Sequence, residues 1–103
     1  MTGKILGQSK PAAATPATLY TVPANKQAQL NLFVANQSTA DTIRIAVVPS
    51  GISLAVQHYI VYDFSIPANG ILNITGLVMN AGDFVVAYST NAYCSFTASG
   101  LEI

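Results

Sequence analysis

The stretch Gln27-Ala-Gln-Leu-Asn-Leu-Phe-Val-Ala-Asn36 decides the fold class of this chain. Apolar and polar side chains alternate along it, so that one face carries Ala28, Leu30, Leu32 and Val34 and the other carries Gln27, Gln29 and Asn31. A period of two is typical of a β-strand that is buried on one face. Residues 42–48 repeat the pattern, and we expect Ile43, Ile45 and Val47 to point inward there.

The rest of the chain indicates further strands separated by turns. Pro, Gly, Asn and Asp gather at 23–26, 49–51, 67–70 and 80–83, where they predict turns. Short β-rich stretches lie at 19–22, 57–64, 71–77, 84–89 and 94–103. Seven or eight strands at this regular spacing predict an all-β, antiparallel β-sandwich. The pattern does not determine strand order, so a jelly-roll and an immunoglobulin-like topology both stay open.

The beginning of the chain has a different character from the rest. Residues 9–17 are rich in Pro and Ala and predict a linker, because proline removes backbone donors and restricts its neighbours. This linker separates a short apolar piece, Lys4-Ile-Leu-Gly7, from the main body. We therefore expect an N-terminal arm and linker at 1–17 and a sandwich domain at 18–103. The apolar piece is either an edge strand of its own domain or an arm laid on a neighbour.

A weak internal repeat links two of the turns. Tyr20-Thr-Val-Pro-Ala-Asn25 resembles Phe64-Ser-Ile-Pro-Ala-Asn69, and a similar Leu-Asn-Leu or Leu-Asn-Ile follows each. Either the same turn chemistry arose twice, or each half of a two-part sandwich contributes a strand, a corner and a returning strand. In both cases the role is geometric, since Pro fixes φ and Asn tolerates a left-handed backbone.

The composition favours association with other proteins. The chain is 51% hydrophobic and only 8% charged, and its formal net charge is zero. Its cations, Lys4, Lys10, Lys26 and Arg44, are scattered, which argues against nucleic acid as a partner because phosphate contacts need clustered cations. A net charge near zero favours association, so we expect partners to cover much of the surface. No apolar run is long enough for a transmembrane helix, and we expect neither a signal peptide nor a membrane partner.

The residues that could carry catalysis lack partners. His58 is the one histidine and lies in an apolar stretch, and Asp63 falls on the opposite face of a regular strand. The remaining acids are Asp41, Asp83 and Glu102, and the two aspartates stand at turns where Asp bonds local backbone. Cys94 is the single cysteine, which excludes an intrachain disulfide. We therefore expect no enzyme activity, no catalytic residues, no metal site and no cofactor.

The tyrosines are the remaining candidates for contacts with a ligand. Four of the five lie in expected strands, where a buried ring with a wet hydroxyl is common. Tyr93 follows the turn Thr90-Asn-Ala92 and is the best candidate for an exposed contact.

Three segments together resemble a known group of proteins. They are Leu19-Tyr-Thr-Val-Pro-Ala24, Ile45-Ala-Val-Val-Pro-Ser-Gly51 and His58-Tyr-Ile-Val-Tyr-Asp63, and the ending Cys94–Ile103 adds to them. The chain thereby resembles the small virion structural proteins and fiber modules of tailed bacteriophages, including cyanophages. The resemblance spans most of residues 4–103. It implies a β-sandwich built into a phage particle, here as a stand-alone module and without catalytic residues.

These observations predict a structural protein of a tailed-phage virion, either a capsid decoration protein or an accessory tail protein. We expect a homo-oligomer, with a trimer as the expected state, that docks on other virion proteins. The candidate interface residues are Lys4, Ile5, Leu6 and Tyr93. The alternative is a carbohydrate- or receptor-binding module at a tail or fiber tip, which would present exposed aromatic side chains. A small hydrolase is the third hypothesis, and it lacks an acid–base pair.

Overall fold

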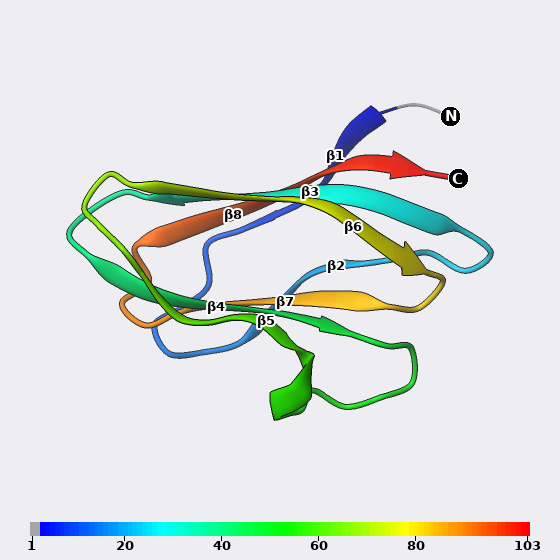
Figure 1. The fold of residues 1–103 in the computed structure, drawn as a ribbon, viewed down its shortest axis with the longest axis horizontal. Coiled ribbons are helices and arrows are strands. Elements are labelled where there is room, and N and C mark those ends of the chain that lie inside the picture. The colour runs from blue at the N-terminus through cyan, green and yellow to red at the C-terminus, as the bar shows by residue number, and fades with distance from the viewer. Residues whose placement is uncertain (1–2) are drawn as a thin grey trace.

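Eight strands in two four-stranded sheets make up the fold in the computed structural model, which describes residues 3–103 (Figure 1). The first sheet has the order β1 (Gly3–Ser9), β8 (Cys94–Glu102), β3 (Gln27–Asn36) and β6 (Ile71–Asn80). The second has the order β2 (Ala17–Thr21), β7 (Phe84–Ser89), β4 (Asp41–Val48) and β5 (Tyr59–Ile66). A single 3₁₀ turn, η1 (Val56–His58), precedes β5.

The pairing of the strands is nested. The first strand pairs with the eighth, the second with the seventh, the third with the sixth and the fourth with the fifth, and every pair is antiparallel. This arrangement is a long hairpin rolled into two sheets, which is the jelly roll. The predicted all-β sandwich is thus confirmed, and of the two topologies left open the jelly roll is the one found.

The main core fills the space between the sheets. Its largest fully buried side chains include Phe96, Leu30, Leu32, Ile43 and Ile45. They come from the alternating inward positions of β3, β4 and β8, because successive side chains of a strand point to opposite faces. Burial of a side chain of this size contributes about 1.5–3 kcal/mol.

A second, smaller core lies on the outer face of the second sheet. Ala46, Val48 and Val86 are buried there, and Leu54, Tyr59 and Phe84 pack against them. Leu54 belongs to the long connection between β4 and β5, which folds back over this part of the sheet. The alternation in β4 therefore gives way near its end to burial on both faces.

The two Pro-Ala-Asn segments form matching corners between the sheets. Asn25 and Asn69 both have positive φ, at 64° and 58°. The N–H of Lys26 donates to the carbonyl of Pro23, and the N–H of Gly70 donates to that of Pro67. One corner joins β2 to β3 and the other joins β5 to β6, so each passes from the second sheet to the first. Both segments thus have the geometric role expected of their Pro and Asn residues.

The expected N-terminal arm needs a correction. Residues 3–9 form β1, the edge strand of the first sheet, which pairs with β8 from Gly3–Leu101 to Ser9–Phe96. Of the two possibilities, the apolar piece is thus an edge strand of its own domain, because β8 offers free backbone groups that β1 satisfies. The expected boundary between residues 17 and 18 falls inside β2, which begins at Ala17. Residues 1–2 of the expected arm lie outside the described residues.

Candidate functional site

The four predicted interface residues do not form one surface. Lys4, Ile5 and Leu6 lie in β1, near the end of β8 that carries Leu101, whereas Tyr93 precedes the opposite end of β8. Ile5 is 62% exposed, but Leu6 packs against the main core and Tyr93 is half-buried. The backbone of Tyr93 is engaged as well, since its N–H donates to Asp41 and its carbonyl accepts from Gln37.

The edge of the sandwich formed by β1 and β2 is closed. Gly7 lies so close to β2 that a Cβ at this position would come within 2.3 Å of the Leu19 carbonyl oxygen. Farther along, the Tyr20 hydroxyl donates to Glu102 Oε2 at 2.5 Å, and Lys4 Nζ lies 3.1 Å from Glu102 Oε1. The hydrogen bonds from Tyr20 and Lys4 lower the pKa of Glu102, and burial together with Glu102 raises the pKa of Tyr20. Lys4 is therefore paired with an acid of its own sheet.

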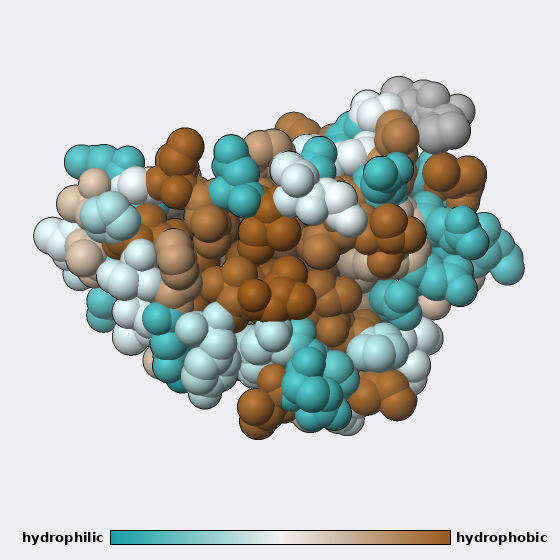
Figure 2. All heavy atoms as spheres, viewed as in Figure 1, coloured by the Kyte–Doolittle hydropathy of each residue, from teal (hydrophilic) through white to brown (hydrophobic). Residues whose placement is uncertain are grey.

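The opposite edge, formed by β5 and β6, is open. Figure 2 shows a hydrophobic band between the two sheets, on the side where β5 and β6 face the reader in Figure 1. Side chains that point into the core stay partly exposed along this edge, namely Val61, Leu72, Ile74 and Leu77. Ile60 and Phe64 of β5 are each 47% exposed. We call these six residues the β5–β6 edge patch.

The β5–β6 edge patch has the properties of an unpartnered interface. It contains no ionisable side chain, and it lies between two edge strands whose outer backbone groups are unpaired within the described sheets. Free strand edges and contiguous exposed apolar area are the features that natural proteins cover with another chain or element. Chemically, this edge can accept an apolar surface or an added strand.

An arginine stacked between two tyrosines lies on the outer face of the second sheet. The Arg44 guanidinium carbon is 4.3 Å from the ring centre of Tyr62 and 4.7 Å from that of Tyr88. Arg44 Nε also donates to Asp63 Oδ1 at 2.6 Å, and this bond to Asp63 raises the pKa of Arg44. Asp63 has a φ of 52° at a register shift in the β4–β5 pairing. The stack holds this irregular part of β5 against the sheet.

Asp41 organises the turn between β7 and β8. It is 2% exposed, and its carboxylate accepts hydrogen bonds from the Ser89 hydroxyl and from the N–H groups of Asn91 and Tyr93. Burial raises the pKa of Asp41, but these bonds together with that from the Thr42 N–H outweigh it and leave the pKa below its ordinary value. The expectation of local bonding from a turn aspartate is too narrow here, because Asp41 holds a segment that is distant in sequence.

The remaining acids and the histidine also have structural partners. Asp83 accepts from the N–H groups of Ser50 and Asn80, both at 2.9 Å. His58 lies in η1 and not in a strand as expected, and its Nδ1 accepts from the Ala55 N–H at 2.9 Å. Within residues 3–103, no three His, Cys, Asp or Glu side chains gather as metal ligands would. No helix among these residues is long and apolar enough to cross a membrane.

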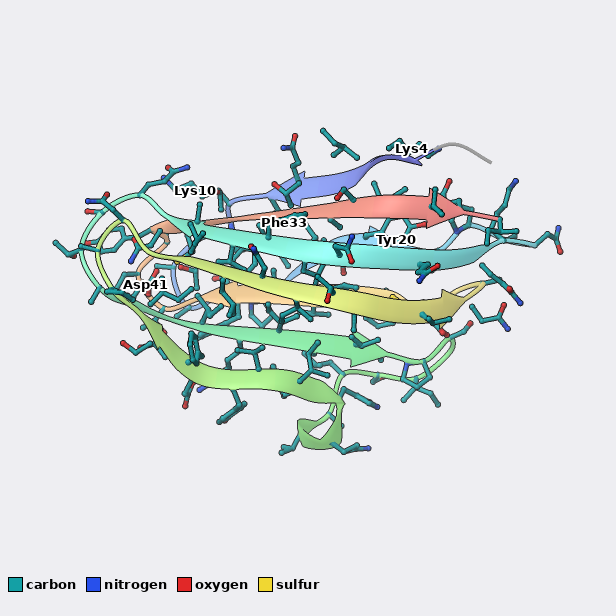
Figure 3. All side chains as sticks on the ribbon, turned by 45° about the horizontal axis from the view of Figure 1, so that its top comes forward. Lys4, Lys10, Tyr20, Phe33 and Asp41 are labelled. Carbon is teal, nitrogen blue, oxygen red and sulfur yellow. The ribbon has the colours of Figure 1, made fainter. Side chains whose placement is uncertain are left out.

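Two shallow depressions adjoin on the outer face of the first sheet. One, of about 300 Å³, is lined by side chains from β3, β6 and β8, including Phe33, Ile71 and Asn73. The other, of about 340 Å³, is lined by Gln8, Ser9 and Lys10 and by residues of β8. Ser95 and Thr97 line both, so the two form one groove across the sheet. Figure 3 shows Phe33 and Lys10 on this side of the molecule.

Sequence reasoning did not identify the β5–β6 edge patch, the Arg44 stack or the groove. Tyr62 and Tyr88 were expected only as ordinary strand tyrosines. Arg44 is the one charged residue of the expected strand 42–48, and this charge in an otherwise largely apolar stretch could have identified it. Arg44 lies opposite Tyr88 and Phe33 lies opposite Thr97 because of how strands distant in sequence are aligned. The sequence carries no signal for this alignment.

Comparisons with known proteins leave these surfaces without an assigned role. No family model, no curated protein and no solved structure matches the chain.

Proposed function

We propose that this protein is a non-catalytic structural component of a tailed-phage particle, a capsid decoration or accessory tail protein, that associates with copies of itself through the β5–β6 edge patch. The observation that carries the self-association is the open edge of the sandwich, where core side chains such as Leu72 and Ile74 stay partly exposed. The resemblance of residues 19–24, 45–51 and 58–63 to virion proteins is what supports a place in a phage particle.

The chemistry of the patch favours a second copy of this chain as the occupant. Two identical patches are both apolar and uncharged, so they match each other without leaving a buried charge unpaired. The formal net charge of zero also removes long-range repulsion between copies. In a trimer the contact is heterologous: the β5 side of each patch meets the β6 side of the next copy, so that the ring closes and no patch stays free.

The association is tested by the mass of the full chain in solution. We expect sedimentation to show an oligomer, with a trimer as the expected state, and the variant Phe64→Lys to sediment as a monomer. Ile60→Lys provides an independent variant, because its side chain is equally exposed. Circular dichroism checks that each variant is folded.

Val56→Lys is the matched control, since Val56 is 80% exposed and lies in η1, outside the patch. This variant should keep the mass of the unmodified protein. If the unmodified protein is a monomer, the β5–β6 edge patch is excluded as the self-association surface. The patch is also excluded if Val56→Lys lowers the mass of the oligomer as much as Phe64→Lys does. Localisation is tested separately, by whether antibody against this chain labels purified phage particles.

A further inference from the structure

The groove on the first sheet is built on a row of side chains that spans all four strands. Phe33 of β3 lies directly opposite Asn73 of β6 on one side and Thr97 of β8 on the other. Thr97 in turn lies opposite Gln8 of β1. Three interstrand spacings cover roughly 14 Å, so the row can contact a ligand longer than a single small ring.

The chemistry of this row is specific. Phe33 is 41% exposed although its neighbours across the strands are an amide and a hydroxyl. An aromatic ring flanked by uncharged donors and acceptors is suited to a ligand that has both an apolar face and polar edges. Carboxylates are absent from the described lining, and Lys10, at the far end, is its one charged residue.

Two hydroxyl groups of the groove have side-chain partners, each through a long and exposed hydrogen bond. Gln8 Nε2 donates to Thr97 Oγ1 at 3.4 Å, and Gln37 Nε2 donates to Ser95 Oγ at 3.4 Å. The lining residues of β3, β6 and β8 stand on paired strands and not on free loops. A site on rigid elements loses little conformational entropy on binding.

We propose that this groove binds a linear, uncharged oligosaccharide. The C–H face of one sugar ring lies on Phe33, and the hydroxyl groups at its edge bond to Asn73 and Thr97, while the chain continues over β8 toward Gln8. A sugar ring has the required combination, since its faces carry C–H groups and its rim carries hydroxyls that both donate and accept. Lys10 then donates to a hydroxyl or ring oxygen at the end of the groove.

Other occupants fit the groove less well. A nucleic acid would need several cations along its backbone, and the described lining contains one. The β5–β6 edge patch of a second copy would leave Asn73 and the hydroxyls of Ser95 and Thr97 facing an apolar surface, which costs free energy for each unpaired group. The site is also separate from the β5–β6 edge patch, so the inference goes beyond the proposed function and either can fail alone.

The test is binding of the full chain to a panel of linear neutral oligosaccharides of glucose, galactose and mannose. Oligomers of uronic acids serve as the charged comparison. We expect at least one neutral oligomer to bind and to shift the NMR signals of the Asn73 amide and the Thr97 methyl group. Phe33→Ala should weaken that binding by about tenfold, because aromatic stacking contributes at this level. Phe33→Tyr keeps the ring and should restore it.

Val78→Ala is the matched control, because Val78 is an equally apolar and more exposed side chain of β6 that is not part of the lining. It should bind like the unmodified protein. The proposal is overturned if no neutral oligomer binds or if only the uronic-acid oligomers bind. It is also overturned if Val78→Ala lowers the affinity as much as Phe33→Ala does. It is also overturned if Phe33→Ala changes the oligomer mass, since Phe33 would then belong to a protein interface.

Discussion

The Ser89 hydroxyl donates a buried hydrogen bond to the Asp41 carboxylate and so ties the end of β7 to the start of β4. The same carboxylate accepts from two N–H groups of the β7–β8 turn, at 3.0 and 3.2 Å. Asp41 therefore fixes the turn in which the chain passes from β7 in the second sheet to β8 in the first.

Removal of the Asp41 carboxylate should destabilise the fold strongly. Asp41→Ala leaves the Ser89 hydroxyl and two backbone N–H groups without their acceptor, and we expect the free energy of unfolding to fall by about 2–4 kcal/mol. Asp41→Asn keeps one acceptor oxygen and should lose about half as much. Urea denaturation measures both variants, and equal losses would contradict the bonding described for this carboxylate.

Stability should decline in acid because two carboxyl groups favour the charged form in the folded state. The pKa values of Asp41 and Glu102 lie below their ordinary values of 3.8 and 4.5. A carboxyl group whose pKa is lowered by folding stabilises the folded state at pH values above its pKa in the unfolded chain. This contribution is lost as the pH falls through the lowered pKa of the folded state. The free energy of unfolding should be level from pH 7 to about pH 5 and decrease below it. The double variant Asp41→Asn, Glu102→Gln should flatten this decrease, and an unchanged slope would assign it to other groups.

The Cys94 thiol should be unreactive in the folded protein. Its side chain is fully buried, and burial together with the nearby Asp41 carboxylate raises its pKa to about 11. A thiol reagent at pH 8 needs the accessible thiolate, so labelling requires unfolding. We expect the labelling rate to rise with urea in parallel with the unfolded fraction. Complete labelling within seconds in buffer alone would show that the turn next to Cys94 opens without global unfolding.

Closure of the β1–β2 edge should depend on Gly7. Gly7→Ala places a Cβ against the Leu19 carbonyl, so the two strands must separate, and overpacking of this kind costs about 1–3 kcal/mol. Gly3→Ala is the control in the same strand, because its nearest contact would be an ordinary 3.6 Å to Leu101. Thermal unfolding should show a lower Tm for Gly7→Ala alone. Equal Tm values for both variants would mean that the close approach is not required.

The parts of the fold that were predicted depend on local patterns. The expected strands at 84–89 and 27–36 match β7 and β3, because alternation is visible within one strand. The end of β6 was missed, since the register shift opposite Asn31 restarts the alternation at Gly76, whose φ is 78°. That shift turns Val78 outward and Met79 inward, so the strand continues to Asn80.

The surfaces could not be predicted because they depend on which strands meet. Nothing in residues 4–7 indicates that β8 is their partner, so an arm and an edge strand look alike in the sequence. The β5–β6 edge patch is equally invisible, since Leu72 and Ile74 have the composition and spacing of core residues. These side chains stay partly exposed because they lie at the open edge of the sandwich, where the hydrophobic band is seen in Figure 2.

The pairing of β1 with β8 has a consequence for how the chain reaches its native state. Of the eight strands these two are the farthest apart in sequence, so the first sheet is completed only after the last strand is available. Contacts between distant residues require costly loop closure before they contribute, and domains dominated by them fold in milliseconds to seconds. During synthesis on the ribosome β1 therefore has no partner until β8 has been made. We expect folding to begin with the central hairpin of β4 and β5.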